Sequence, residues 1–385
     1  MDEITEIAVE QLAMVQQRIG PRFPRSEMRE RAQRYMRGLL QHIERKNGWQ
    51  LAEAQDESGP QGMQRLLNAA TWDADLVRDD LRTYVVEQFA EASSGILVLD
   101  ETGFLKKGRK SAGVGRQYSG TAGRRENQQI GVFLLYASQR GAAFIDRELY
   151  LPEDWAHDEA RRAEAHIPLE RAFATKGILA QQMLQRAFAA HLSAAWVVGD
   201  TVYGSDALRQ WLEQQQQAYV LAVPSTHGVW TRGQHRTVAD LAQQLPDAAW
   251  SRLTAGDGSQ GPRWYDWAWM QLPYTTPAMA FQQWVLVRRT LASATAPEQP
   301  VEYAYYRVFG PSALTLAAVV LVAGHRWAIE MAFEQAKGEV GLDEYEVRRY
   351  DAWYRHMTLS MFTHAFLEVT RMQVTQKGAP YQQRA

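Results

Sequence analysis

The sequence predicts an α/β protein with a mixed β-sheet, preceded by a helical region and interrupted by a β-rich segment. Residues 1 to about 90 carry apolar side chains at helical spacing, and the pattern changes to short apolar runs at Gly95. Strands come first in this second part and then alternate with helices, which is typical of an α/β sheet. From about Ser225 to Pro311 short aromatic segments alternate with Gly and Pro turns, which indicates a β-rich insertion.

Composition and charge exclude several classes of protein. The 385 residues exceed the size at which one core usually keeps growing, so we expect two or three structural units. A net charge of -2 argues against a polybasic protein, and any nucleic-acid contact must come from local patches. The absence of cysteine excludes disulfides, thiolate zinc sites and a cysteine nucleophile. The N-terminus lacks a secretion-signal layout, and the longest apolar run is too short to cross a bilayer. We therefore expect a soluble, cytoplasmic protein with no membrane partner.

The changes of pattern divide the chain into four segments. The predicted segments are a helical region at 1–92, the first part of an α/β core at 93–224, a β-rich insertion at 225–311, and the second part of the core with C-terminal helices at 312–385. The helical region is locally basic, because Arg18 to Lys46 holds nine cations and three acids in a chain of net charge -2. Such a patch suits phosphate groups.

Two predicted central strands end in an aspartate. The runs Gly95 to Asp100 and Ala195 to Asp200 are both short, apolar and closed by the acid. Residues at strand ends face the crevice where open α/β sheets place ligands, and buried carboxylates require a positive partner. Oxygen ligands without cysteine favour a hard cation such as Mg²⁺. The alternative, that each aspartate only starts a loop or caps a helix, stays open.

A third candidate lies on the predicted helix that follows His325. Arg326, Glu330, Glu334 and Lys337 are spaced by four, four and three residues, so they share one helix face. The flanking residues are small and apolar, which favours a partly buried polar stripe. A solvated row of salt bridges is the alternative that spacing leaves open.

Several stretches of the chain carry a resemblance to a known family. They are VLDETGFLKKG (98–108), GVGRQYSGTAGR (113–124), GVFLLYAS (131–138), LYLPEDW (149–155), VVGDTVYG (197–204), YVLAVP (219–224) and RWAIEMAFEQAKGEVGLDEYEVRRY (326–350). The chain resembles DDE transposases of bacterial insertion sequences, specifically the insertion-sequence-701 family, whose catalytic core is ribonuclease-H-like. Arg326, Glu330 and Lys337 match the Arg, Glu and Lys of the signature Tyr-x2-Arg-x3-Glu-x6-Lys. Its Tyr position holds Ala323, so the signature is incomplete.

The resemblance implies a catalytic centre with two metal ions. Asp100, Asp200 and Glu330 would be the catalytic, metal-binding acids, holding two Mg²⁺ ions for which Mn²⁺ is expected to substitute. Glu334 and Glu339 are competing third acids, but Glu330 alone satisfies both intervals of the signature. The implied activity is hydrolysis of phosphodiester bonds at transposon ends, followed by joining of the 3′-OH ends to target DNA.

The remaining candidates are residues that would contact DNA. Arg326 and Lys337 would hold phosphates near the scissile bond, unless they only form salt bridges on their helix. Two further groups are basic: the loop residues Lys106, Lys107 and Arg109, and the helix residues Arg25, Arg29, Arg34 and Arg37. The loop suits backbone contact or merely adds solubility, and the helix is the candidate for binding the terminal inverted repeat.

Three tryptophans of the insertion are candidates for stacking on a DNA base. We expect Trp264, Trp267 and Trp269 to share one strand face, and Trp267 to stack on a flipped base, as an aromatic residue does in similar transposases. An aromatic face packed in the core is the alternative.

The expected partners are double-stranded DNA, as transposon-end inverted repeats and as target, and a second copy of the chain in the DNA complex. A bacterial cytoplasmic location with nucleoid association follows. Two other functions stay open: a domesticated or inactive transposase that only binds DNA, and a metal-dependent nuclease of the same fold.

Overall fold

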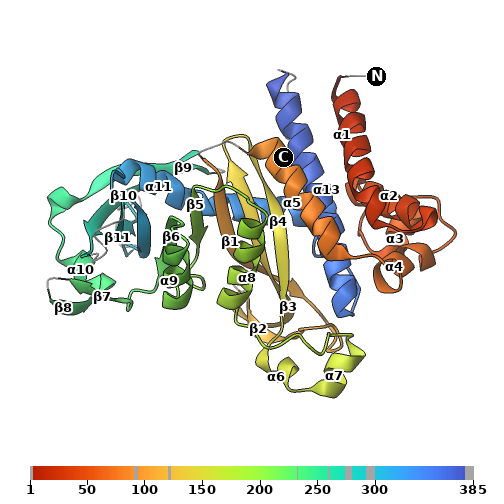
Figure 1. Cartoon of the computed structure of the whole chain (residues 1–385), viewed down its shortest axis with the longest axis horizontal. Coiled ribbons are helices and arrows are strands. Elements are labelled where there is room, and N and C mark those ends of the chain that lie inside the picture. Colours follow the sequence, from red (N-terminus) through yellow and green to blue (C-terminus); the bar gives the residue numbers. More distant parts are fainter. Residues whose placement is uncertain are drawn as a thin grey trace.

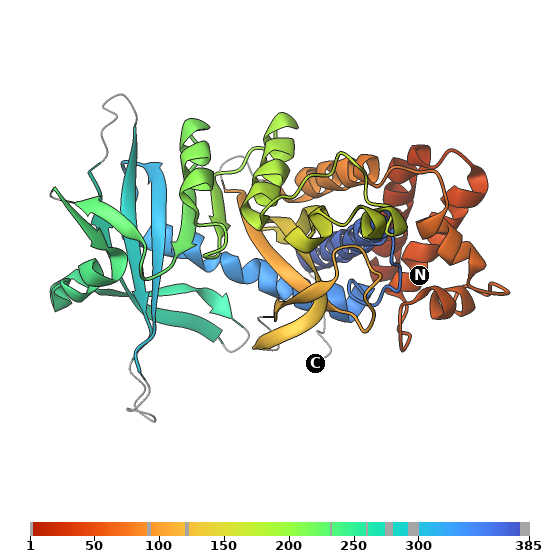
Figure 2. The same ribbon diagram turned by 90° about the horizontal axis from the view of Figure 1, so that it is seen from below.

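The computed structural model describes residues 3–90, 94–119, 123–231, 233–258, 261–273, 280–291 and 300–377. The predicted boundary between residues 92 and 93 lies outside these ranges. The described chain forms a row of three regions, with N-terminal helices at one end, the first half of the sheet in the middle and β-rich strands at the other end (Figures 1 and 2). The predicted fold class, an α/β protein with an N-terminal helical region and a large mixed sheet, is confirmed.

The N-terminal region consists of helices that bury the apolar positions seen in the sequence. Its elements are α1 (Glu3–Ile19), η1 (Gly20–Arg22), α2 (Ser26–Leu40), α3 (Gly48–Glu53), α4 (Gln61–Asn68) and α5 (Ala74–Phe89). The side chains of Asn47 and Asp73 cap the starts of α3 and α5 by accepting backbone N–H groups. The buried residues of α2 recur at helical spacing and lie on one face, so Arg29, Arg34 and Arg37 lie on the outer face.

One mixed sheet runs through the rest of the molecule. Its strands are β1 (Ile96–Leu105), β2 (Gly115–Ser119), β3 (Arg124–Ser138), β4 (Gly141–Tyr150), β5 (Trp196–Gly199), β6 (Tyr219–Val223), β9 (Ser251–Gly258), β10 (Gly261–Gln271), β11 (Phe281–Arg289) and β12 (Tyr303–Pro311). They lie in the order β2-β3-β1-β5-β6-β12-β11-β10-β9, with β4 paired to β3. The β1–β5 and β5–β6 pairs are parallel and the others antiparallel.

The strands of the insertion extend the same sheet. Antiparallel pairing of β12 with β6, from Tyr305 opposite Val223 to Phe309 opposite Tyr219, joins them to the core. A separate hairpin of β7 (Gly228–Thr231) and β8 (Gln234–Thr237) precedes them. The insertion therefore brings its strands to the edge of β6, two strands away from β1.

The other helices cover the sheet and connect it to the N-terminal region. They are α6 (Glu153–Ala156), α7 (Glu159–Glu164), α8 (Lys176–Ala189), α9 (Asp206–Gln214), α10 (Val238–Gln243), η2 (Asp247–Ala249), α11 (Leu316–Gly324), α12 (Arg326–Val340) and α13 (Tyr350–Gln376). Helix α13 packs on β4 and on α1, α2, α4 and α5, which explains why most of its residues are buried (Figure 1). It therefore fixes the helical region to the core.

The α11–α12 segment, Leu316–Val340, is long and apolar enough to cross a membrane by length and composition alone. A core helix passes the same test, and 44% of the window is already buried inside the protein. Both helices contact strands of the sheet, and α12 carries Arg326 and Glu330 beside β1. This packing explains the apolar composition without a membrane.

Candidate active site

Asp100 lies where the parallel pairing of β1 with β5 stops. That pairing ends at Leu99 opposite Gly199, so Asp100 has strand β3 on one side and an open edge on the other. The prediction that β1 ends at this aspartate was wrong, because antiparallel pairing with β3 continues the strand to Leu105. Asp100 therefore still lies where the β1–β5 pairing ends, as predicted for a strand end.

Asp200 follows β5 directly and lies beside Asp100. The Asp200 Oδ1 atom accepts the Val202 N–H at 2.9 Å, and the Asp100 Oδ1 atom accepts the Glu101 N–H at 2.8 Å. Burial, and after it the negative charge of Asp200, raise the pKa of Asp100 to about 7. Burial also raises the pKa of Asp200, with repulsion from Glu101 as the next cause. Two carboxylates thus share a site that disfavours their charge.

Glu330 reaches the first aspartate through Arg326. The Arg326 Nη1 atom lies 3.4 Å from Asp100 Oδ2, and Arg326 Nη2 pairs with Glu330 Oε1 one helical turn away. Of the competing third acids, Glu339 pairs with Arg371 of α13 and Glu334 is exposed. The structure therefore brings Asp100, Asp200, Arg326 and Glu330 together.

The donor set suits a hard divalent cation, although its three acids are held apart. Among the described residues no three acidic or histidine side chains come close enough to hold a metal ion. Asp100 and Asp200 are partly buried, and among the described residues Arg326 pairs with Asp100 and no cation pairs with Asp200. The raised pKa values of both acids indicate unbalanced negative charge. Oxygen-only ligands of this kind fit Mg²⁺ or Mn²⁺. Asp100, Asp200 and Glu330 are the residues that would hold it.

Comparison with known proteins agrees with the geometry. Residues 18–248 match the DDE superfamily endonuclease family, and residues 176–366 match the transposase DDE domain family. The first match covers more than half of the chain and includes both aspartates. The chain belongs to the DDE superfamily endonucleases. It is also 27% identical over 195 residues to the "Probable transposase for insertion sequence element IS701" of Microchaete diplosiphon, which covers 50% of this chain. The chain spans about half of that relative, 48% of its length, and the resemblance to insertion-sequence transposases is confirmed.

Glu101 is a further acid beside the candidate site of this DDE endonuclease, and reasoning from the sequence missed it. Glu101 Oε1 accepts a hydrogen bond from Lys176 Nζ at 2.6 Å, and Glu101 Oε2 accepts one from the Tyr203 hydroxyl at 2.5 Å. Lys176 is the first residue of α8, and Tyr203 lies in the turn after β5, where it is fully buried. The only sequence signal was the adjacent pair of acids, Asp100 and Glu101. The cluster ties α8 and the loop after Asp200 to β1.

Lys337 lies on the same side of β1 as Asp100, two residues farther along the strand. Its Nζ atom donates to Thr102 Oγ1 at 2.8 Å, and burial lowers the pKa of the ammonium group. Helix α12 therefore runs along β1 and presents Arg326, Glu330 and Lys337 to it in sequence.

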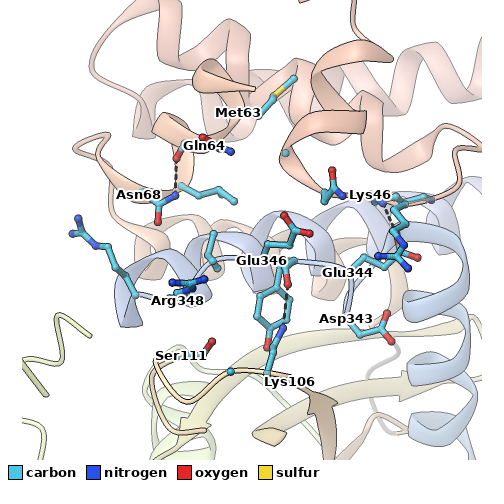
Figure 3. A pocket seen from close by; sticks show the side chains of 18 of the residues that line it. Lys46, Met63, Gln64, Asn68, Lys106, Ser111, Asp343, Glu344, Glu346 and Arg348 are labelled. Atoms are coloured by element: carbon cyan, nitrogen blue, oxygen red, sulfur yellow. Dashed lines mark hydrogen bonds between the residues drawn. The ribbon is translucent and has the colours of Figure 1, made fainter. Parts of the chain in front are cut away.

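The basic loop after β1 divides into buried and exposed residues. Lys106 Nζ donates to the Tyr345 carbonyl at 3.0 Å and lies 3.4 Å from the centre of the Tyr345 ring, and burial lowers its pKa to about 8. Lys107 and Arg109 are exposed, with no ion pair among the described residues. The loop borders a groove of about 1070 Å³ between the N-terminal helices and the segment after α12 (Figure 3).

The arginines predicted to bind inverted repeats lie far from the acids, in the N-terminal region. All four, Arg25, Arg29, Arg34 and Arg37, are exposed on or next to α2. Two of them have intramolecular partners. Arg29 Nε donates to the Gly20 carbonyl at 3.1 Å, and Arg34 lies 3.8 Å from Glu57. The face stays available for a ligand, and α2 lies in the helical region at the opposite end of the molecule from β10 and β11 (Figure 1).

The tryptophans of β10 do not share one face. Trp264 is 49% exposed and Trp267 only 1%, because residues three apart on a strand point to opposite sides. Trp267 packs against Tyr306 and lines a small cavity of about 210 Å³ that also contacts Arg326 and Glu330. A base cannot stack on Trp267 without rearrangement, so the core alternative describes this residue in the DNA-free chain.

Proposed function

We propose that the chain is an insertion-sequence transposase that binds transposon-end inverted repeats, cleaves phosphodiester bonds with Mg²⁺ and joins the 3′-OH ends to target DNA. One observation carries the proposal: Asp100 and Asp200, 100 residues apart in the chain, both lie where the pairing of β1 with β5 ends, and Arg326 links Glu330 to Asp100. The family match and the transposase relative support it independently.

The residues of the chain divide the work of such a reaction. When bound by Asp100, Asp200 and Glu330, divalent ions supply the charge that activates the attacking water and stabilises the leaving 3′-oxygen. Arg326 and Lys337 would hold phosphates near the scissile bond, and their common position on α12 beside β1 supports this role. No activated serine or tyrosine is needed, since the freed 3′-hydroxyl is itself the second nucleophile.

Binding of the rest of the DNA is assigned to two exposed basic surfaces. The first is the loop with Lys107 and Arg109, whereas Lys106 acts as a structural residue that anchors this loop to Tyr345. The second is the helix surface with Arg25, Arg29, Arg34 and Arg37. A homodimer in the DNA complex is part of the proposal, because both transposon ends must be cut together. The expected place of action is the bacterial cytoplasm, where the nucleoid lies.

Cleavage of labelled DNA that carries the flanking inverted repeats tests this function. With Mg²⁺ present, we expect nicks at the transposon ends that vanish in Asp100→Ala and persist in Glu10→Ala, which changes an exposed acid on α1. Shifted but uncut DNA would instead indicate a domesticated DNA-binding descendant. Cutting of any DNA, irrespective of its ends, would indicate a nuclease of the same fold.

A further inference from the structure

Arg326 occupies the position between two acids that a metal ion would need. Its guanidinium contacts Asp100 of β1 at 3.4 Å and also pairs with Glu330 of α12. Among the described residues no other cation lies within ion-pair distance of either acid. A guanidinium and a divalent cation both bind carboxylate oxygens, so they compete for Asp100 and Glu330.

The surroundings limit where the guanidinium can go once it leaves these acids. The cavity of about 210 Å³ lined by Arg326 and Glu330 is also lined by Arg263 and Arg288. Arg263 donates to the carbonyls of Ala255 and Gly324, at 2.5 and 3.0 Å. These two guanidinium groups repel a third, so Arg326 can move farther into the cavity only together with an anion.

Side chains that line the same cavity carry buried donors without an acceptor. Among the described residues, the indole N–H groups of Trp267 and Trp327 and the Nε atoms of Arg263 and Arg288 have no hydrogen-bond partner. Buried donors of this kind are costly unless an acceptor-rich group arrives. A DNA phosphate supplies both the negative charge and the acceptor oxygens that the cavity and Arg326 require.

We infer that Arg326 is a resident counter-cation, which holds Asp100 and Glu330 in the DNA-free protein and exchanges them for a DNA phosphate when a divalent cation binds. This inference rests on the proposed function, since it assumes that the same acids bind metal. It assigns one side chain two successive partners and couples metal binding to DNA binding. Arg326 thereby becomes a positioning residue that keeps the acids together without metal.

Titration of the full-length, DNA-free protein with Mn²⁺, followed by calorimetry or electron paramagnetic resonance, tests the exchange. We expect Arg326→Gln to bind Mn²⁺ about tenfold more tightly than the wild type, because the competing guanidinium is gone. Arg326→Lys should lie between the two, since an ammonium group keeps the charge but not the fork that spans both acids. Thermal unfolding of each variant reports whether it is folded.

Arg263→Gln is the matched control. It removes one guanidinium from the same cavity, but that guanidinium contacts backbone carbonyls and not the acids. Its Mn²⁺ affinity should stay within about twofold of the wild type. If Arg263→Gln and Arg326→Gln increased the Mn²⁺ affinity equally, the increase would come from the loss of one positive charge near the site. That result would overturn the exchange.

Adding a short DNA duplex gives a second readout. The wild type should bind Mn²⁺ more tightly with DNA present, and Arg326→Gln should lose most of this gain because coupling between two ligands is reciprocal. If Asp100→Asn abolishes Mn²⁺ binding but Arg326→Gln does not tighten it, the exchange fails and the metal centre stands. Binding that is insensitive to Asp100→Asn overturns both the metal centre and the exchange.

Discussion

Two groups of buried acids in the same sheet have opposite electrostatic surroundings. On β4, Asp146 is paired with Arg186 at 2.8 Å and Arg78 at 3.1 Å, and Glu148 with Arg171 and Arg186 at 2.7 Å. Burial alone would raise the pKa of Asp146, but Arg186 and Arg78 hold it below its ordinary value. In the crevice beside β1 and β5, the pKa values of Asp100 and Asp200 are raised.

The difference separates Asp146 and Glu148, which form ion pairs that stabilise the fold, from Asp100 and Asp200, to which we assign metal binding. The arginines around Asp146 and Glu148 come from α5, α8 and the loop before α8, so this cluster joins the sheet to its covering elements. Arg326 pairs with Asp100, and no cation of the described residues pairs with Asp200, so the negative charge of these two acids stays largely unbalanced. Charge balance, more than burial, distinguishes the two groups.

The largest expected effect is on catalysis. Asp200→Asn removes a carboxylate from the unbalanced pair, and cleavage of transposon-end DNA should fall by on the order of 10³-fold or more. Gel assays of labelled DNA measure the rate, and urea titration should show no loss of stability. Asp206→Asn, an exposed acid on the neighbouring α9, is the control and should cut normally. If Asp200→Asn cut DNA at the normal rate, Asp200 would not be a catalytic acid, and the raised pKa values would not identify the catalytic acids.

The balanced group should respond in its stability. Asp146→Asn leaves Arg78 and Arg186 without their buried partner, and the free energy of unfolding should fall by about 3 to 5 kcal/mol. Urea titration followed by circular dichroism measures it. Asp154→Asn, which removes an exposed partner of Arg161, should cost less than about 1 kcal/mol. Equal, small losses in both variants would contradict a structural role for the β4 acids.

The pH dependence of stability should also distinguish the two groups. The folded protein holds the proton of Asp100 up to a pH of about 7, compared with an ordinary pKa of 3.8. Below pH 3.8 the Asp100 carboxyl group is protonated in both the folded and the unfolded chain, and it costs no stability. As the pH rises toward and through 7, the folded protein loses stability because this carboxyl group must ionise in its partly buried site. In metal-free buffer at pH 8, Asp100→Asn should therefore be more stable than the wild type, by about 1 to 3 kcal/mol.

Thermal or urea unfolding across pH 4 to 8 measures that gain, with the pH values chosen to bracket the shift. The advantage of Asp100→Asn should shrink steadily as the pH falls toward 4. A constant difference between variant and wild type would show that Asp100 does not titrate with a raised pKa.

The smallest expected effects concern two neighbouring lysines, one exposed and one engaged within the protein. Lys107 is exposed and Lys106 is engaged by Tyr345, so Lys107→Ala should weaken DNA binding a few-fold and reduce its salt slope by about one, without loss of stability. Lys106→Met should lower stability instead, because the Tyr345 carbonyl loses its donor. Fluorescence anisotropy at several salt concentrations measures the first effect, and urea titration the second. If Lys106→Met weakened DNA binding and Lys107→Ala lowered stability instead, the roles assigned to these two lysines would be wrong.

The sequence alone determined the local features and the family. Helical spacing predicted the N-terminal helices, apolar runs predicted β1 and β5, and the spacing of Arg326, Glu330 and Lys337 placed them on one helix face. These features depend on neighbours within a few residues, so periodicity reveals them. The domain boundaries and the roles of the site residues stay predictions.

Tertiary structure decided which charges meet. Asp100 and Arg326 are 226 residues apart in the chain, and only the packing of α12 along β1 makes them partners. The same applies to Lys106 on Tyr345 and to β12 beside β6, which made the insertion part of the core sheet. Whether a charge is free or already paired depends on long-range contacts, and no local pattern contains them.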